Sequence, residues 1–148
     1  AMRKELYKAI IEAVSEVEEI KHIDLWNKNV EYIEVDEPFL MPAVFVEFTP
    51  VSWQRLTGPV QEWKGTGNVN LHIVTQWHGS AAAGSDEMEE NLAAFDLAEK
   101  IHNALEGLTG TNYRDMSLVQ TQTNHNHEEI FENIETYKVH YKRCLNDE

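Results

Sequence analysis

Two histidines separated by one residue, His125 and His127, form the first pattern in the chain that could do chemistry. Glu128 and Glu129 follow directly, and imidazole and carboxylate groups both bind divalent metals. Alternate residues of an extended segment lie on the same side, which would bring both rings to one ion. A stable site needs a third or fourth ligand, which another histidine would supply only through a tertiary approach that the sequence does not fix. We therefore expect a solvated polar turn and no cofactor, with a metal site at His125 and His127 as the alternative.

The local patterns that mark catalytic sites are missing from the sequence. It contains no GxSxG elbow, no HExxH zinc helix and no glycine-rich phosphate loop. The only cysteine, Cys144, lies beside Lys142 and Arg143, and we expect a surface thiol there. The glutamates between positions 16 and 19 and between 128 and 135 are typical of solvated faces rather than of an acid–base pair. The sequence thus predicts a protein that is not an enzyme.

A turn flanked by two tryptophans indicates a different kind of site. Folding the chain at Thr57-Gly58-Pro59-Val60 brings Trp53 and Trp63 onto diagonal positions of two strands, and their polar neighbours favour a projecting hairpin. Tryptophan and arginine are enriched at the centres of protein interfaces. We predict a subunit interface on this arm, with local hairpin packing of the tryptophans as the alternative. The candidate interface residues are Trp53, Arg55, Leu56, Val60 and Trp63.

The composition limits the class of protein. The chain has 148 residues, of which 42% are hydrophobic, and this supports a real core and excludes a disordered segment. No apolar run approaches the roughly 20 residues of a membrane span. A formal charge of −14 would repel a nucleic-acid backbone, and a single cysteine excludes an intramolecular disulfide. We expect a cytoplasmic protein with no membrane or sequence-specific nucleic-acid partner.

Hydrophobic periodicity predicts two helices. The first runs from Arg3 to about Glu19, and the second begins at Asp86, where Asp86 and Glu89 form a capping-box-like start, and stops near Gly107. The expected buried stripe of the first helix is Leu6, Ile10, Ala13, Val17 and Ile20, and that of the second is Met88, Leu92, Phe95, Ala98, Ile101 and Leu105.

Alternating apolar residues and turn signals predict the strands. The expected strands are Ile23 to Trp26, Ala43 to Phe48, Asn68 to Trp77, Met116 to Thr123 and Tyr137 to Tyr141, with Val30 to Val35 left open and a bulge or bend at Gly65 to Gly67. This order predicts an α+β two-layer sandwich, with a mainly antiparallel sheet, two helices on one face and a projecting hairpin. We expect a single domain over residues 2–148, because the length suits one domain and no linker is visible. Ala1 is left out, because Ala before Met2 is typical of a cleaved tag. The other sheet face is either solvated or packed against another copy.

The order of elements resembles the tail terminator, or tail completion, proteins of long-tailed bacteriophages. The segments PAVFVEF and GNVNLHIVTQW belong to this resemblance. It implies a non-enzymatic phage or prophage virion protein, assembled in the host cytoplasm and located in the virion tail. Such proteins form a ring, commonly a hexamer, that caps the tail tube and docks to the head connector.

Physical arguments agree with this resemblance. An acidic subunit could line a channel through which DNA slides without adsorbing, and a closed ring needs a heterologous contact that an apolar arm can make. Two alternatives remain open at this point. One is a small metal-binding module or metal-dependent enzyme using His125 and His127, and the other is a monomeric adaptor whose sheet edge accepts a peptide strand.

Overall fold

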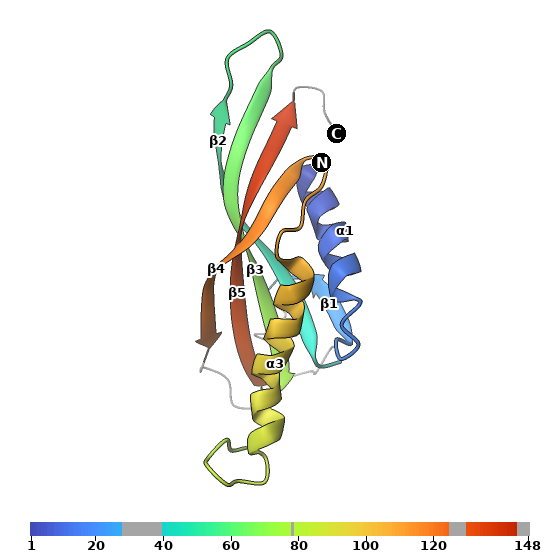
Figure 1. The fold of residues 1–148 in the computed structure, drawn as a ribbon, viewed down its shortest axis with the longest axis vertical. Helices are drawn as coiled ribbons and strands as arrows, with labels where there is room; N and C mark the ends of the chain where they lie inside the picture. Colours follow the sequence, from blue (N-terminus) through green and yellow to red (C-terminus); the bar gives the residue numbers. More distant parts are fainter. Residues whose placement is uncertain (28–39, 78, 125–129, 145–148) are drawn as a thin grey trace.

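Two helices cover one face of a five-stranded sheet in the computed structural model, which describes residues 1–27, 40–77, 79–124 and 130–144 (Figure 1). The expected α+β sandwich is confirmed. The elements, in chain order, are α1 (Met2–Val14), β1 (His22–Leu25), β2 (Ala43–Arg55), β3 (Glu62–Gln76), α3 (Met88–Leu105), β4 (Tyr113–Asn124) and β5 (Ile130–Cys144).

The strand order in the sheet is β1-β2-β3-β5-β4. Among the strands that the structure describes, β1 and β2 run parallel, while the other three pairs are antiparallel. The last two strands along the chain form an antiparallel hairpin, because β4 pairs with β5. The segment Val30 to Val35, for which the sequence left pairing open, lies outside the described residues.

The core lies between the helices and one sheet face. Val69, Leu71 and Ile73 of β3 are fully buried on the helix side, as their alternation predicts. The matching residues of the helices are also fully buried: Leu6, Ile10 and Val14 from α1, and Ile101 and Leu105 from α3. Each helix therefore contributes one apolar stripe to a shared core.

The first helix is shorter than its periodicity predicts, because α1 ends at Val14 rather than near Glu19. Beyond Val14 the hydrogen bonds shorten to three-residue steps, from the Val17 amide to the Val14 carbonyl and from the Ile20 amide to the Val17 carbonyl. Val17 and Ile20 nevertheless pack against the core. These turns keep the apolar spacing and also redirect the chain into β1.

The second helix begins later than expected and presents a different stripe at its start. It begins at Met88 after the cap residue Glu87, whose side chain makes no capping bond, so the expected capping box is not formed. Leu92 and Phe95 were expected to be buried but are 38% and 45% exposed. Asn91 is buried instead, because its amide nitrogen donates to the Ser80 carbonyl at 2.6 Å.

The bulge expected at Gly65 to Gly67 is not in β3, which continues through these residues. The irregularity lies opposite them in β2, between Phe48 and Val51. A Cβ at Gly67 would come within 3.0 Å of the Pro50 carbonyl oxygen, and one at Gly65 within 2.8 Å of the Trp53 ring. The two glycines therefore allow β2 and its tryptophan to approach β3 closely.

Candidate assembly surface

The strands β2 and β3 continue past both helices as an arm at one end of the molecule (Figure 1). Trp53 is paired with Gly65 and Arg55 with Trp63, so the two tryptophans occupy the diagonal positions expected of them. The arm also has a third strand, because β5 pairs along β3 as far as Glu62. The connection of residues 56–61 extends beyond the paired strands.

Trp53 is packed within this arm. Its ring lies against Gly65, and its centroid is 6.4 Å from that of Tyr141. The Arg143 guanidinium lies 4.9 Å from the Trp53 ring centroid, in cation–π contact. The contacts that Trp53 makes are thus those of local packing, one of the two interpretations that the sequence allowed.

The exposed side chains of the arm lie nearer its end. The Arg55 guanidinium is exposed and lies 5.8 Å from the centroid of the Trp63 ring, which is half-buried. Leu56 and Val60, on either side of the turn, are 39% and 59% exposed. The five candidate residues are therefore brought together in one arm, with two of its apolar side chains open to solvent.

A groove of about 420 Å³ lies between the arm and the segment of residues 109–114, which is a loop and the start of β4, and Leu56, Trp63 and Tyr141 also line it. Glu5 of α1 holds this loop, because its carboxylate accepts hydrogen bonds from the Thr111 amide at 2.6 Å and the Asn112 side chain at 3.0 Å. Burial raises the pKa of Tyr141 to about 12. Glu5 thus holds the loop side of the groove in place.

A buried polar cluster lies on the opposite sheet face, and the sequence did not predict it. The Nδ1 atom of His72 is 2.6 Å from Glu132 Oε2, and its Nε2 atom is 2.7 Å from Glu47 Oε1. The Trp26 ring stacks on the imidazole, with 3.8 Å between centroids and an angle of 5°. The Asn124 amide nitrogen donates to the other Glu132 oxygen at 2.7 Å.

The prediction that the glutamates between positions 128 and 135 form a solvated face is therefore wrong for Glu132 and Glu135. Glu132 is 2% exposed, and Glu135 is also buried, accepting a hydrogen bond from the Thr121 hydroxyl. Both carboxylates stay buried because neighbouring strands supply donors for them.

The cluster around His72 is a set of direct hydrogen bonds rather than a metal site. Within residues 1–27, 40–77, 79–124 and 130–144, no three His, Cys, Asp or Glu side chains are placed to hold a metal ion. His125 and His127, the alternative metal ligands, lie outside the described residues. No helix in the described part of the chain is long and apolar enough to cross a membrane.

The described residues form an α+β sandwich with two helices on one face of the sheet and an extended arm of strands. A similar solved structure is a chain in "Virion of native gene transfer agent (GTA) particle", with a TM-score of 0.51 and 9% identity. The similarity covers 90% of this chain and 84% of that chain, and it shows a shared fold. No family model matches the sequence, and no curated protein sequence matches it.

Proposed function

We propose that this chain is a structural protein of a phage or prophage virion, of the tail terminator type. It acts by assembly rather than by catalysis. The observation that carries the proposal is the likeness to a chain of a gene transfer agent virion, which extends over 90% of this chain and 84% of the other. A fold shared over nearly the whole of both chains supports a role of the same general kind, a component that is built into a particle.

The proposed mechanism is the closure of copies of this chain into a hexameric ring. The ring caps the tail tube, stops its growth and offers a docking surface to the head connector. A closed ring needs a heterologous contact, in which one surface of a subunit meets a different surface of the next. The arm supports such a contact, because Leu56 and Val60 present apolar surface at its end.

The charge of the chain supports the same proposal. Its formal charge of −14 disfavours adsorption of a phosphate backbone, so a ring of these subunits would let DNA pass through its channel. Assembly would take place in the host cytoplasm, and the finished protein would reside in the virion tail.

The test is the assembly state of the purified chain, alone and with tail-tube protein. Size-exclusion chromatography with light scattering measures the mass, and negative-stain microscopy shows rings or capped tube ends. We expect a hexamer in solution or at the ends of tubes, since some rings form only on the tube. An unrelated protein of similar negative charge is the control for non-specific adsorption. A chain that stays monomeric and ignores the tubes would contradict the proposal.

A further inference from the structure

The first half of α3 carries an apolar surface that the core does not cover. Leu92 and Phe95 lie one turn apart on the helix, and both are exposed. The Phe95 ring is held in place by Phe131 of β5, with 5.6 Å between centroids and an edge-on angle of 82°. Phe131 in turn contacts Trp77, at 5.4 Å. This aromatic surface is therefore anchored to the sheet and still open to solvent.

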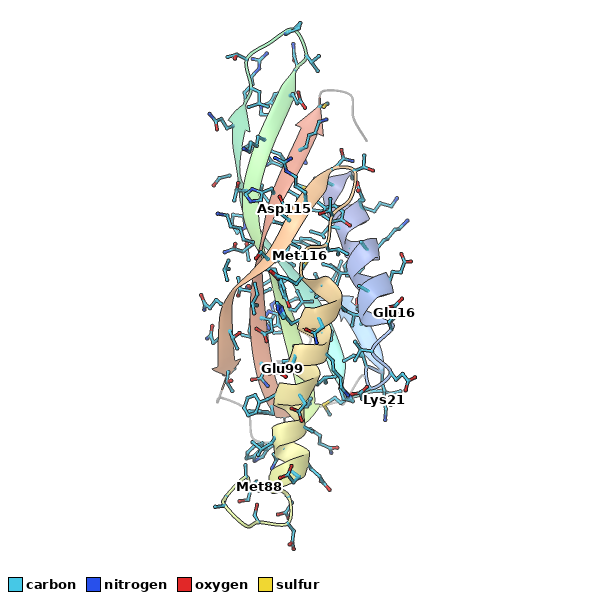
Figure 2. All side chains as sticks on the ribbon, viewed as in Figure 1. Glu16, Lys21, Met88, Glu99, Asp115 and Met116 are labelled. Carbon is cyan, nitrogen blue, oxygen red and sulfur yellow. The ribbon has the colours of Figure 1, made fainter. Side chains whose placement is uncertain are left out.

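Acidic side chains surround this surface. Residues 79–99 contain six carboxylates and neither lysine nor arginine. Glu89 and Asp96 lie three and four residues from Leu92, and Glu99 lies four from Phe95, so all three are its neighbours on the helix. All three are exposed, and Glu99 is labelled on α3 in Figure 2. A partner for this surface must therefore be both apolar and basic.

The far end of the same molecule has that chemistry. Leu56 and Val60 are the exposed apolar residues of the arm. Around them, residues 53–64 and 141–144 contain four basic side chains and one carboxylate, although the whole chain has only 12 basic residues against 26 acidic ones. The arm and the start of α3 lie at opposite ends of the long axis, so the arm of one molecule does not meet its own α3 (Figure 1).

We propose that the Leu92–Phe95 surface of α3 receives the β2–β3 arm of a second copy of this chain. Leu56 and Val60 would cover Leu92 and Phe95. Basic residues of the arm, Arg55 among them, would face the acidic rim, which is formed by Glu89, Asp96 and Glu99. This inference rests on the proposed ring and supplies its missing half, the surface that accepts the arm. The contact is heterologous and runs head to tail, so it can repeat around a ring.

A charge-exchange experiment tests this contact. One variant carries Arg55→Glu with Lys64→Glu and makes the arm acidic, while the other carries Glu89→Lys with Asp96→Lys and makes the rim of α3 basic. Each variant alone brings like charges together at every contact, and we expect its association to weaken at least tenfold. In an equimolar mixture the acidic arm meets a basic α3 and the basic arm meets an acidic α3, so assembly should return to that of the wild-type chain.

Sedimentation velocity measures association in solution, and microscopy measures it on tail tubes if the wild-type chain assembles only there. Far-UV circular dichroism checks that each variant is folded. If the arm variant does not fold, Arg55→Gln with Lys64→Gln takes its place. If the α3 variant does not fold, Glu89→Gln with Asp96→Gln takes its place.

The outcomes separate this contact from the ring itself. A wild-type chain that stays monomeric, with or without tubes, contradicts the ring and the contact together. A wild-type chain that assembles while both variants assemble equally well contradicts the contact alone. If folded variants fail to recover when mixed, or if the α3 variant still forms rings but loses the tube, another partner occupies this surface and the inference is wrong.

Discussion

The imidazole of His72 and the carboxylate of Glu132 are in direct contact, with 2.6 Å between Nδ1 and Oε2, on the sheet face that the helices leave open. They belong to neighbouring strands, because His72 pairs with Ile134 in the register of β3 and β5. The imidazole bridges two carboxylates, because its other ring nitrogen, Nε2, lies 2.7 Å from Glu47 Oε1 on β2. This cluster joins β2, β3 and β5 and turns part of the outer face into a second interior.

Replacing Glu132 should therefore destabilise the fold. In Glu132→Ala, the buried His72 loses one of its two carboxylates, and the half-buried Asn124 amide loses one acceptor. Removing one partner of a buried polar cluster leaves the others unsatisfied, so we expect the free energy of unfolding to fall by about 2–4 kcal/mol. Urea unfolding followed by circular dichroism measures this. Glu16→Ala, at an exposed position after α1 (Figure 2), is the matched control, and equal stability of the two variants would contradict the role of the cluster.

Removing the hydroxyl of Tyr141, unlike replacing Glu132, should not lower the free energy of unfolding. It is buried and has no hydrogen-bond partner among the described residues, so Tyr141→Phe should leave stability at neutral pH unchanged or raise it by about 1 kcal/mol. Tyr137→Phe is the contrast, because its hydroxyl lies 3.2 Å from Nδ1 of His102, and losing that bond should cost about 1 kcal/mol. Chemical denaturation at pH 7 measures both, and a marked loss of stability in Tyr141→Phe would show that its hydroxyl does have a partner.

The same tyrosine predicts a loss of stability in alkali. Burial raises the pKa of Tyr141 from 10.0 to about 12, so the folded state holds this proton more tightly than the unfolded state does. The shifted pKa contributes about 2–3 kcal/mol to the free energy of unfolding. This contribution is fully present below pH 10 and is lost as the pH rises from 10 through 12. Tyr141→Phe should flatten this part of the stability curve. Unfolding measured between pH 8 and 12 checks the slope, and parallel curves for the two proteins would contradict the assignment.

The alternation of apolar residues predicted where the strands lie and which residues of β2 and β3 share a face, but not their full length: β2 continues to Arg55 and β5 begins at Ile130. In β2, Val44 and Val46 join the helix-side core, while Phe45 lies on the other face with Val74 of β3. A strand has a fixed period of two, so once one face is known the other follows from the sequence. The same period of two places Val74, between Ile73 and Thr75, on the outer face, where the structure has it.

What the sequence could not supply is the position of one element relative to another. The burial of Glu132 depends on His72, which is 60 residues away in the chain and meets it only through the register of β3 and β5. The exposure of Leu92 and Phe95 has a similar cause, because periodicity identifies a helix face but not how far the core extends beneath it. Both features, the buried cluster and the open α3 surface, depend on tertiary placement.

Gly65 should be intolerant of any side chain. A Cβ there would lie 2.8 Å from the Trp53 ring and 2.9 Å from a Val51 methyl, so Gly65→Ala must displace the tryptophan. We expect a loss of about 1–3 kcal/mol from overpacking, together with a change in tryptophan fluorescence as Trp53 shifts relative to Arg143. Ser52→Ala, at an exposed position of the same arm, is the control. An unchanged emission spectrum and unfolding midpoint in Gly65→Ala would show that Trp53 is not held against this glycine.

The end of the arm should matter for assembly and not for folding. Leu56→Asp with Val60→Asp places two charges on side chains that are already exposed, so the free energy of unfolding should change by less than about 1 kcal/mol. The same charges would face the acidic rim of the neighbouring α3, and we expect association to weaken at least tenfold in sedimentation velocity or at tube ends. Leu56→Ser with Val60→Ser removes apolar surface without adding charge and should give an intermediate loss. A folded Asp variant that assembles as the wild-type chain does would mean that subunits meet through a surface other than this arm.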